Sequence, residues 1–152
     1  MAVRHLDGVL AVENAVYPFP WTRGNFVDSL AAGYDARVLH DAQGGVVGYL
    51  VAMAGVDEMH LLNVTVAPLA QGEGHARRLF DALVAICRGR GATRLWLEVR
   101  ESNLRAREIY RHWRFSEVGR RRGYYPADQG RREDAIVMSL AITARGGGDA
   151  LD

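Results

Sequence analysis

The chain has 152 residues, of which 49% are hydrophobic and 24% are charged, with a formal net charge of +1. This composition is typical of one folded globular domain and argues against disorder throughout the chain. No run of 18 apolar residues and no apolar N-terminal segment occurs, so neither a transmembrane helix nor a secretory signal is predicted. We therefore expect a cytoplasmic protein that does not associate with membranes.

Two residue counts exclude whole classes of chemistry. All 19 basic residues are arginine, so catalysis through a lysine Schiff base and a Walker A lysine are both excluded. The single cysteine, Cys87, excludes an intramolecular disulfide and a zinc site built from cysteines. Its position on an apolar helix stripe predicts an ordinary core residue.

The first half of the chain predicts two helices and then strands. Residues 5–16 carry apolar residues at helical spacing, and the two prolines Pro18 and Pro20 end that helix. Thr22 is a suitable N-cap for a second helix that ends at Gly33. Strands are predicted at 37–40, 46–54 and 60–66, and a turn at 41–45 makes the first two a hairpin.

The second half alternates helices and strands. The longest helix is predicted over 74–90, with a strand at 93–99, a short helix at 103–112 and strands at 115–122 and 135–142. The strand–helix–strand segment 60–99 has the length of a parallel crossover, while the hairpins imply antiparallel neighbours. The fold class is therefore α+β with a mixed sheet. We expect one domain over 1–142 and a flexible glycine-rich tail over 143–152.

Charge is unevenly distributed along the chain. Residues 77–132 contain 15 arginines against six acidic residues, whereas residues 1–76 contain three arginines against eight acidic residues. A basic half is consistent with an anionic ligand, such as a phosphate-bearing cofactor or RNA, and equally with a solvated arginine-rich face. The five histidines show no metal-binding spacing, and no nucleophile elbow is present, so neither a metal site nor an α/β-hydrolase is predicted.

The most informative segment is a glycine-containing loop between a strand and the longest helix. Unpaired backbone N–H groups and the positive end of the helix dipole favour an anion such as pyrophosphate at this junction. Gly72 and Gly74 allow the backbone to approach it closely. Arg77 and Arg78 occupy the first helical turn, where a positive charge is unfavourable unless an anion binds nearby.

This loop resembles the acetyl-CoA motif of the GNAT acetyltransferases, in the sequence Gln71-Gly72-Glu73-Gly74-His75-Ala76. The likeness continues through a second motif at Asn103, Ala106, Tyr110 and Phe115, and covers about residues 5–142. It implies the GNAT fold, a mostly antiparallel sheet with a splayed parallel pair and flanking helices. The family normally opens with a strand before the first helix, and here that strand is missing or very short. A second departure is Arg114, where the family usually has glycine.

Within the family, five segments resemble the ribosomal-protein-alanine N-acetyltransferase type: residues 20–21, 95–100, 102–103, 124–126 and 133–138. The resemblance implies direct acetyl transfer from acetyl-CoA to the N-terminal alanine amine of a small-subunit ribosomal protein, with no metal. Glu98 would be the general base and Tyr110 the general acid. Cofactor contacts would come from Val64, Thr65, Val66, Gln71, Gly72, Glu73, Gly74, His75, Ala76, Arg77 and Asn103, and acceptor contacts from Trp21, Tyr124 and Tyr125.

Each of these residues also has an ordinary structural explanation. Glu98 could pair with an arginine, Tyr110 could pack on its helix, Asn103 could be a helix cap and the aromatic residues could be core. Two other functions stay open: a GNAT enzyme for other protein N-termini or a small amine, and a non-catalytic basic RNA-binding module. For the enzyme we expect a monomer with no stable nucleic-acid binding.

Overall fold

The computed structural model describes residues 1–143, so the expected tail over 143–152 lies almost wholly outside the described residues. The chain forms two compact units. Unit 1 comprises Met1–Ala54 and Leu61–Ile86, and unit 2 comprises Gly55–His60 and the chain from Cys87 onward. Six strands form one sheet in the order β1-β2-β3-β4-β6-β5. The expected mixed α/β class is therefore confirmed.

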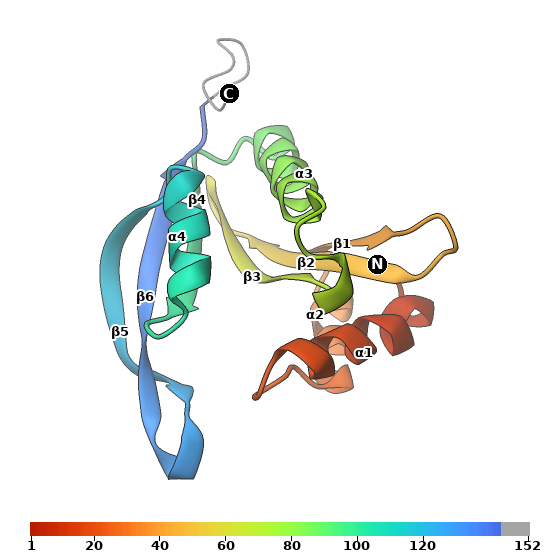
Figure 1. Ribbon diagram of the computed structural model, residues 1–152. Helices are drawn as coiled ribbons and strands as arrows, with labels where there is room; N and C mark the ends of the chain where they lie inside the picture. The colour runs from red at the N-terminus through yellow and green to blue at the C-terminus, as the bar shows by residue number, and fades with distance from the viewer. Residues whose placement is uncertain (144–152) are drawn as a thin grey trace. The chain divides into compact units, whose positions relative to one another are not determined.

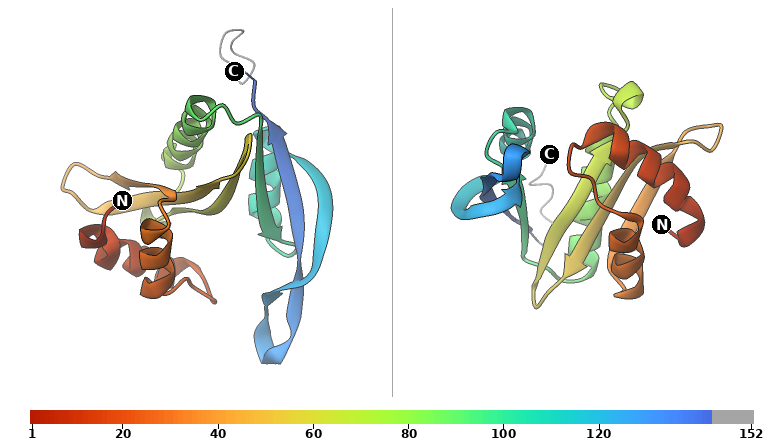
Figure 2. Two further views of the ribbon diagram at one scale, coloured as in Figure 1. Left: turned by 180° about the vertical axis from the view of Figure 1, so that it is seen from behind. Right: turned by 90° about the horizontal axis from the view of Figure 1, so that it is seen from below.

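Unit 1 contains the first two helices, the first strands and most of α3. Its elements are α1 (Leu6–Val16), α2 (Arg23–Ala31), β1 (Asp35–His40), β2 (Val46–Ala54), most of β3 (Glu58–Val66) and α3 (His75–Gly89). The helices α1 and α2 cover one face of these strands, and α3 covers the opposite face (Figures 1 and 2). β1 and β2 pair antiparallel with Arg37 opposite Leu50. No strand precedes α1 within residues 1–143, as the sequence indicated.

Local sequence explains where the first helices begin and which face they bury. Leu6, Val9 and Val12 recur at helical spacing on α1 and are all buried. Thr22 caps α2 as predicted, since its side chain accepts a hydrogen bond from the backbone of Asn25, and the Asn25 side chain accepts one from the backbone of Thr22. The α1 residues pack in one buried cluster with Phe26, Ala36, Tyr49 and Val51.

Unit 2 contains β4 (Arg94–Arg100), α4 (Leu104–His112), β5 (Ser116–Pro126) and β6 (Arg132–Ala141). β6 pairs antiparallel with both β4 and β5, and β5–β6 form the long hairpin of Figure 2. Leu95, Leu97 and Val99 are buried on β4, while Trp96, Glu98 and Arg100 alternate with them on the other face. The alternation therefore assigns Glu98 to the more polar face of the strand.

Two details complete the comparison with the expected elements. Cys87 is fully buried, as an ordinary core residue should be. β5 continues to Pro126, four residues beyond the predicted end at Arg122, because Tyr125 pairs with Glu133 on β6. Among the helices in residues 1–143, none combines the length and the apolar character needed to cross a bilayer.

Candidate active site

The glycine loop and the start of α3 lie together in unit 1. Gly72 and Gly74 have φ angles of +83° and +84°, which L side chains rarely adopt, and a Cβ at either position would meet no atom within 4 Å. The glycines are therefore required for backbone conformation, and the space beside them is open. The first N–H groups of α3 have no carbonyl partner within the helix, as at any helix start. These features are compatible with the predicted anion site, which stays a prediction.

The side chains beside this loop bond mostly to one another. Arg77 donates through Nε to Asp81 Oδ1 at 2.9 Å, one turn further along α3, and its guanidinium lies 6.0 Å from the Phe80 ring centroid. His75 Nε2 lies 3.2 Å from Glu73 Oε1. The Nδ1 atom of His75 is buried and has no hydrogen-bond partner. A buried nitrogen without a hydrogen-bond partner lowers the stability of a folded protein and is rare. A polar ligand bound beside the start of α3 would supply the missing hydrogen bond.

β3 ends with Val64, Thr65 and Val66, and the 3-10 turn Pro68–Ala70 separates it from the loop. The Thr65 side chain is buried, donating to Asn63 Oδ1 at 2.8 Å and lying 2.8 Å from the Tyr17 hydroxyl. This side chain is therefore part of the core. Gln71, at the start of the loop, donates from Nε2 to the Val66 carbonyl at 3.4 Å, which ties the loop to the strand end.

A buried carboxylate that the sequence reading did not single out supports this region. Glu13 on α1 is 1% exposed and accepts three hydrogen bonds: from the Tyr49 hydroxyl at 2.6 Å, from Asn63 Nδ2 at 3.1 Å and from the Trp21 backbone N–H at 2.9 Å. Burial, with the Glu13 hydrogen bond, raises the pKa of Tyr49. The network links β2, β3 and the loop carrying Trp21. An acidic residue on the apolar stripe of α1 was the available signal.

Trp21 itself packs against the core of unit 1. Its ring lies 5.1 Å from the Phe26 ring, which contacts Tyr49 edge-on at 5.9 Å. The position of Trp21 thus depends on α2 through Phe26 and on α1 through Glu13.

Glu98 lies in unit 2 within a charged cluster. Its Oε1 atom is 2.5 Å from His60 Nε2, and its Oε2 atom is 3.3 Å from Arg121 Nε. Burial raises the pKa of the Glu98 carboxyl, but the hydrogen bond and charge of His60, and then Arg121, outweigh burial and hold the pKa below its usual value. Glu98 therefore stays ionised at neutral pH and has a distinct imidazole partner that the sequence reading missed.

The aromatic residues of β5 surround the same cluster. The rings of Tyr124 and Tyr125 meet edge-on with centroids 4.9 Å apart. The Arg121 guanidinium lies 5.4 Å from the Tyr124 ring, and that of Arg100 lies 4.6 Å from the Tyr125 ring. Burial and the nearby charge of Glu98 raise the pKa of Tyr125, so its hydroxyl remains protonated. The structure thus places Tyr125 within electrostatic range of Glu98, and Tyr124 beside Tyr125 and Arg121.

Tyr110 lies on α4, and Asn103 is the residue that precedes this helix. The Asn103 side-chain oxygen accepts from the Ala106 backbone at 3.1 Å and caps the helix. The half-buried Tyr110 ring contacts Phe115 and Trp113 edge-on, at 5.5 and 6.1 Å between centroids. Asn103 therefore acts as a helix cap and Tyr110 packs against other aromatic rings. Their spacing of seven residues places both on the same side of α4, about two turns apart.

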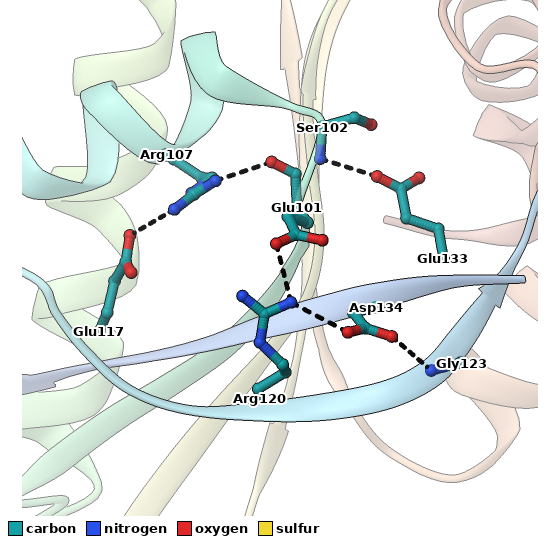
Figure 3. Close-up of polar contacts among 8 residues, drawn as sticks. All are labelled: Glu101, Ser102, Arg107, Glu117, Arg120, Gly123, Glu133 and Asp134. Atoms are coloured by element: carbon teal, nitrogen blue, oxygen red, sulfur yellow. Dashed lines mark hydrogen bonds and ion pairs between the residues drawn. The ribbon is translucent and has the colours of Figure 1, made fainter.

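Many arginines of the basic half are neutralised by acidic partners. Figure 3 shows Arg120 between Glu101 and Asp134, at 2.8 and 2.9 Å, while Arg107 donates to the Glu101 carbonyl at 2.8 Å and pairs with Glu117 at 3.1 Å. Further hydrogen bonds in the same view run from the Ser102 backbone to Glu133 and from the Gly123 backbone to Asp134. These contacts connect the β5–β6 hairpin to the segment that precedes Asn103. These arginines therefore have structural roles within unit 2.

Comparison with known proteins gives a consistent result. Residues 6–115 match the model of the Acetyltransferase (GNAT) family. The chain is 36% identical over 138 residues to the ribosomal protein bS18-alanine N-acetyltransferase of Escherichia coli K12, covering 91% of this chain and 92% of the relative. It is 33% identical over 131 residues to the protein of that name from Haemophilus ducreyi, covering 86% and 90%.

Solved structures agree with these relatives. The crystal structure of the ribosomal-protein-S18-alanine N-acetyltransferase from Escherichia coli matches with a TM-score of 0.85 at 33% identity, covering 98% of this chain and 95% of that one. Among the described residues, no group of three or more histidine, cysteine, aspartate or glutamate side chains is arranged to hold a metal ion.

Proposed function

The chain belongs to the GNAT family of acetyltransferases, and from this premise we propose that it acetylates the N-terminal alanine of a ribosomal protein, using acetyl-CoA. The observation that carries the proposal is the 36% identity over nine-tenths of the chain to a relative with that activity in its name. We propose further that it acts in the cytoplasm as a monomer, with no metal and no membrane partner.

Acetyl-CoA is the co-substrate in this proposal, and the open space beside Gly72 and Gly74 is where its pyrophosphate fits. The helix start provides unpaired N–H groups and a positive dipole end, both of which favour the negative phosphates. The unpartnered Nδ1 of His75 adds a polar group at the same place. The backbone of Val64, Thr65 and Val66 would pair with the pantetheine arm. Supporting contacts would come from Gln71, Glu73, Ala76, Arg77 and Asn103.

Catalysis in this proposal needs an acceptor for one proton and a donor for another. An α-amino group has a pKa of about 7.7–8.0, so roughly a tenth of it is neutral at pH 7, and only modest base catalysis is required. Glu98, ionised on the polar face of β4, takes the amine proton directly or through water. Tyr110 donates a proton to the departing CoA thiolate. A backbone N–H near the end of β3 stabilises the oxyanion of the tetrahedral intermediate.

The acceptor peptide would contact Trp21, Tyr124 and Tyr125. Tyr125 is favoured because it interacts electrostatically with Glu98, and Tyr124 because it contacts Arg121, which pairs with Glu98. Tyr124 is also among the exposed large side chains of the described residues. Aromatic rings offer a large contact area at small conformational cost, which suits a flexible peptide end.

The test is acetyl transfer to a peptide that begins with alanine, followed by direct detection of free CoA. Glu98→Gln should keep acetyl-CoA affinity and lower kcat by about 10²–10⁴-fold at pH 7, with a smaller loss at higher pH because more of the amine is already neutral. Tyr110→Phe should lose rate at thiolate departure, and raising the pH should not restore it in the same way. Glu117→Gln, which removes a β5 carboxylate paired with Arg107, is the matched control and should leave kcat within about twofold.

A panel of acceptors separates the alternatives. Equal or faster transfer to other N-terminal residues or to small amines would replace the alanine assignment with a broader GNAT activity. Salt-dependent RNA binding without acetyl-CoA binding would support the non-catalytic module instead. Near-normal turnover of Glu98→Gln at pH 7 would remove Glu98 from the mechanism.

A further inference from the structure

Glu13 is an acidic residue at a core position of α1, and the mechanism described so far gives it no role. The other buried residues of this helix, Leu6, Val9 and Val12, are all apolar. Only 1% of Glu13 is exposed. Burying a carboxylate is costly, and well-packed apolar residues in place of buried charged groups often leave stability unchanged or improve it. Stability alone is therefore a weak reason for a glutamate at this position, and the groups that it binds indicate another.

The first of these groups belongs to the segment between α1 and α2, residues 17–22, which we call the Trp21 loop. Its two prolines, Pro18 and Pro20, have no backbone N–H to donate. The Trp21 backbone N–H, which follows them, donates to Glu13 Oε2 at 2.9 Å. The Glu13 carboxylate therefore ties the middle of this loop to the buried face of α1.

The same carboxylate is connected to the strands β2 and β3. Its Oε1 atom accepts from the Tyr49 hydroxyl at 2.6 Å and from Asn63 Nδ2 at 3.1 Å. Asn63 Oδ1 in turn accepts from Thr65 Oγ1 at 2.8 Å, and the Tyr17 hydroxyl lies 2.8 Å from the same Thr65 oxygen. Because the one hydroxyl proton of Thr65 is used by Asn63, Tyr17 is the donor in that contact. A chain of hydrogen bonds thus runs from the first residue of the Trp21 loop to Glu13, and from there back to the middle of the loop.

This chain reaches the part of β3 whose backbone is expected to pair with the pantetheine arm. The Tyr17 hydroxyl also lies 3.4 Å from the Val64 carbonyl oxygen, which is a long hydrogen bond. Asn63 and Thr65 are both buried. Burial raises the pKa of Tyr17, so its hydroxyl keeps its proton near neutral pH. Within unit 1, the Trp21 loop is therefore attached both to α1 and to the end of β3.

The Trp21 ring is fixed by the same neighbours. It lies 5.1 Å from the Phe26 ring, and Phe26 contacts the Tyr49 ring at 5.9 Å. Tyr49 therefore supports Trp21 twice, through its ring and through its hydroxyl bond to Glu13. Trp21 is half-buried, and Phe19 in the same loop is 41% exposed. The loop thus offers aromatic surface on a backbone that is held from within the core.

We propose that Glu13 is a positioning residue for the acceptor peptide: its carboxylate holds the Trp21 backbone, and through it the Trp21 ring, in the place where the peptide binds. The inference rests on the proposed function, in which Trp21 contacts the acceptor. Glu13 touches no reacting atom in this role. A loop that is already in its binding conformation loses less entropy on binding a flexible peptide than a loop that must first be ordered. Glu13 therefore acts on acceptor affinity and not on the chemical step.

The kinetic test uses Glu13→Gln. Glutamine has nearly the same shape, and its carbonyl can still accept from Tyr49 and Asn63, but its amide then faces the Trp21 N–H, so that two donors meet. We expect the KM for an alanine-starting peptide to rise at least about tenfold, because the loop leaves its binding position. The kcat and the KM for acetyl-CoA should stay within about twofold, which is the pattern expected when only acceptor binding is lost.

The matched control is Val9→Ala. This change removes apolar volume from the same buried face of α1 and lowers stability, but leaves the carboxylate and its three hydrogen bonds in place. All three kinetic constants should stay within about twofold of the wild-type values at a temperature where the variant is folded. A rise in acceptor KM as large as that of Glu13→Gln would show that loss of stability is sufficient, and would overturn the proposal.

A double-mutant cycle tests whether Glu13 acts through Trp21. Trp21→Ala should itself raise the acceptor KM at least about tenfold, because the ring that contacts the peptide is lost. Glu13→Gln added to Trp21→Ala should then raise the KM by less than about twofold more, since the ring that the carboxylate positions is no longer present. Effects that multiply in the double variant would show that the two residues act independently, which contradicts the proposal.

Amide hydrogen exchange followed by NMR needs no substrate. The Trp21 amide should exchange at least about tenfold faster in Glu13→Gln than in the wild-type protein. The Tyr17 amide is the internal control, because it donates to the Glu13 backbone carbonyl at 3.1 Å, which the substitution leaves in place. Equal acceleration at both amides would show a general loss of stability, and no acceleration at Trp21 would show that the carboxylate does not hold the loop. Either result overturns the proposal.

The kinetic outcomes also separate this inference from the proposed function. If the wild-type protein acetylates the peptide and Glu13→Gln leaves the acceptor KM unchanged, the positioning role is wrong and the proposed function stands. If kcat falls or the KM for acetyl-CoA rises as much as the acceptor KM, the effect is not confined to acceptor binding and the role is again wrong. If the wild-type protein transfers no acetyl group to any acceptor, the proposed function fails and the positioning role fails with it.

Discussion

Replacing Glu13 by alanine should be among the most destabilising single changes in unit 1. The substitution leaves the Tyr49 hydroxyl, the Asn63 amide and the Trp21 backbone N–H without the carboxylate that accepts their hydrogen bonds. A hydrogen bond to a charged group contributes about 1.5–3 kcal/mol, and an orphaned buried donor costs a similar amount. Part of this loss is offset because a buried charge is also removed, so we expect a net destabilisation of about 3–5 kcal/mol.

The size of this effect makes it easy to measure. Domains are stable by about 5–15 kcal/mol, and in a chain of this size each kcal/mol lowers the Tm by about 2–4 °C, so a fall of about 10 °C is expected. Urea unfolding followed by circular dichroism measures the free energy directly. Glu13→Gln should lose less, because its carbonyl still accepts from Tyr49 and Asn63, although its amide faces the Trp21 N–H.

The matched control is the neighbouring exposed residue of the same helix. Asn14→Ala should change stability by no more than about 0.5 kcal/mol, since Asn14 lies outside the buried network. If Glu13→Ala loses less than about 1 kcal/mol, the three hydrogen bonds do not stabilise unit 1 as argued. The polar network would then be incidental to the position of Trp21.

Three further predictions follow from the loop, the turn and the ion pairs. Gly74→Val should raise the Kd for acetyl-CoA at least tenfold in calorimetry, because a β-branched residue is strained at φ +84° and projects into the proposed pyrophosphate site; unchanged affinity would contradict that site. Arg114→Gly should raise the free energy of unfolding by about 0.5–1 kcal/mol, because Arg114 has a φ of +75°, which glycine adopts without strain. As a control, Glu108→Gly in the exposed middle of α4 should lower the free energy of unfolding by about 1 kcal/mol. Equal effects of the two variants in thermal unfolding would refute this reasoning.

The third prediction concerns the loss of stability in acid. Hydrogen bonds from the Gly123 backbone and from Arg120 lower the pKa of Asp134 in the folded protein. Asp134 therefore contributes fully to the free energy of unfolding above its unfolded pKa of about 3.9, and this contribution is lost as the pH falls through the lower folded pKa. Asp134→Asn should flatten the loss of stability below about pH 4, and an unchanged acid-unfolding curve would exclude this contribution.

Local signals in the sequence were sufficient for most elements and for the glycine loop. The Thr22 cap, the prolines after α1 and the apolar spacing of α1 act within one or two helical turns, so the observed bounds differ from the expected ones by only a residue or two. The glycine requirement at positions 72 and 74 is equally local, because it depends on the φ angles of those two residues alone. The departure at Arg114 was visible in the sequence as a missing glycine.

Contacts between segments far apart in the sequence decided the features that local signals did not predict. β5 extends to Pro126 because β6 offers hydrogen-bonding partners there, a condition that no local pattern in β5 expresses. Arg114 adopts the left-handed conformation that glycine favours, so the turn between α4 and β5 keeps this shape at the cost of some strain. The structure also showed which arginines of the basic half have acidic partners, and most of those partners come from other strands.

The side-chain environments that matter for chemistry were also set by the tertiary structure. Glu98 and His60 are 38 positions apart, and the sequence motif that indicated Glu98 contains no trace of its imidazole partner. Glu13 appeared as one acidic residue near the end of a helix, while its donors come from β2, from β3 and from the Trp21 loop. Backbone conformation is largely decided by neighbours in sequence, whereas burial and charge pairing depend on which strands the fold places side by side. For this reason the sequence alone determined the elements and the family, and only the tertiary structure decided the partners of Glu98 and Glu13.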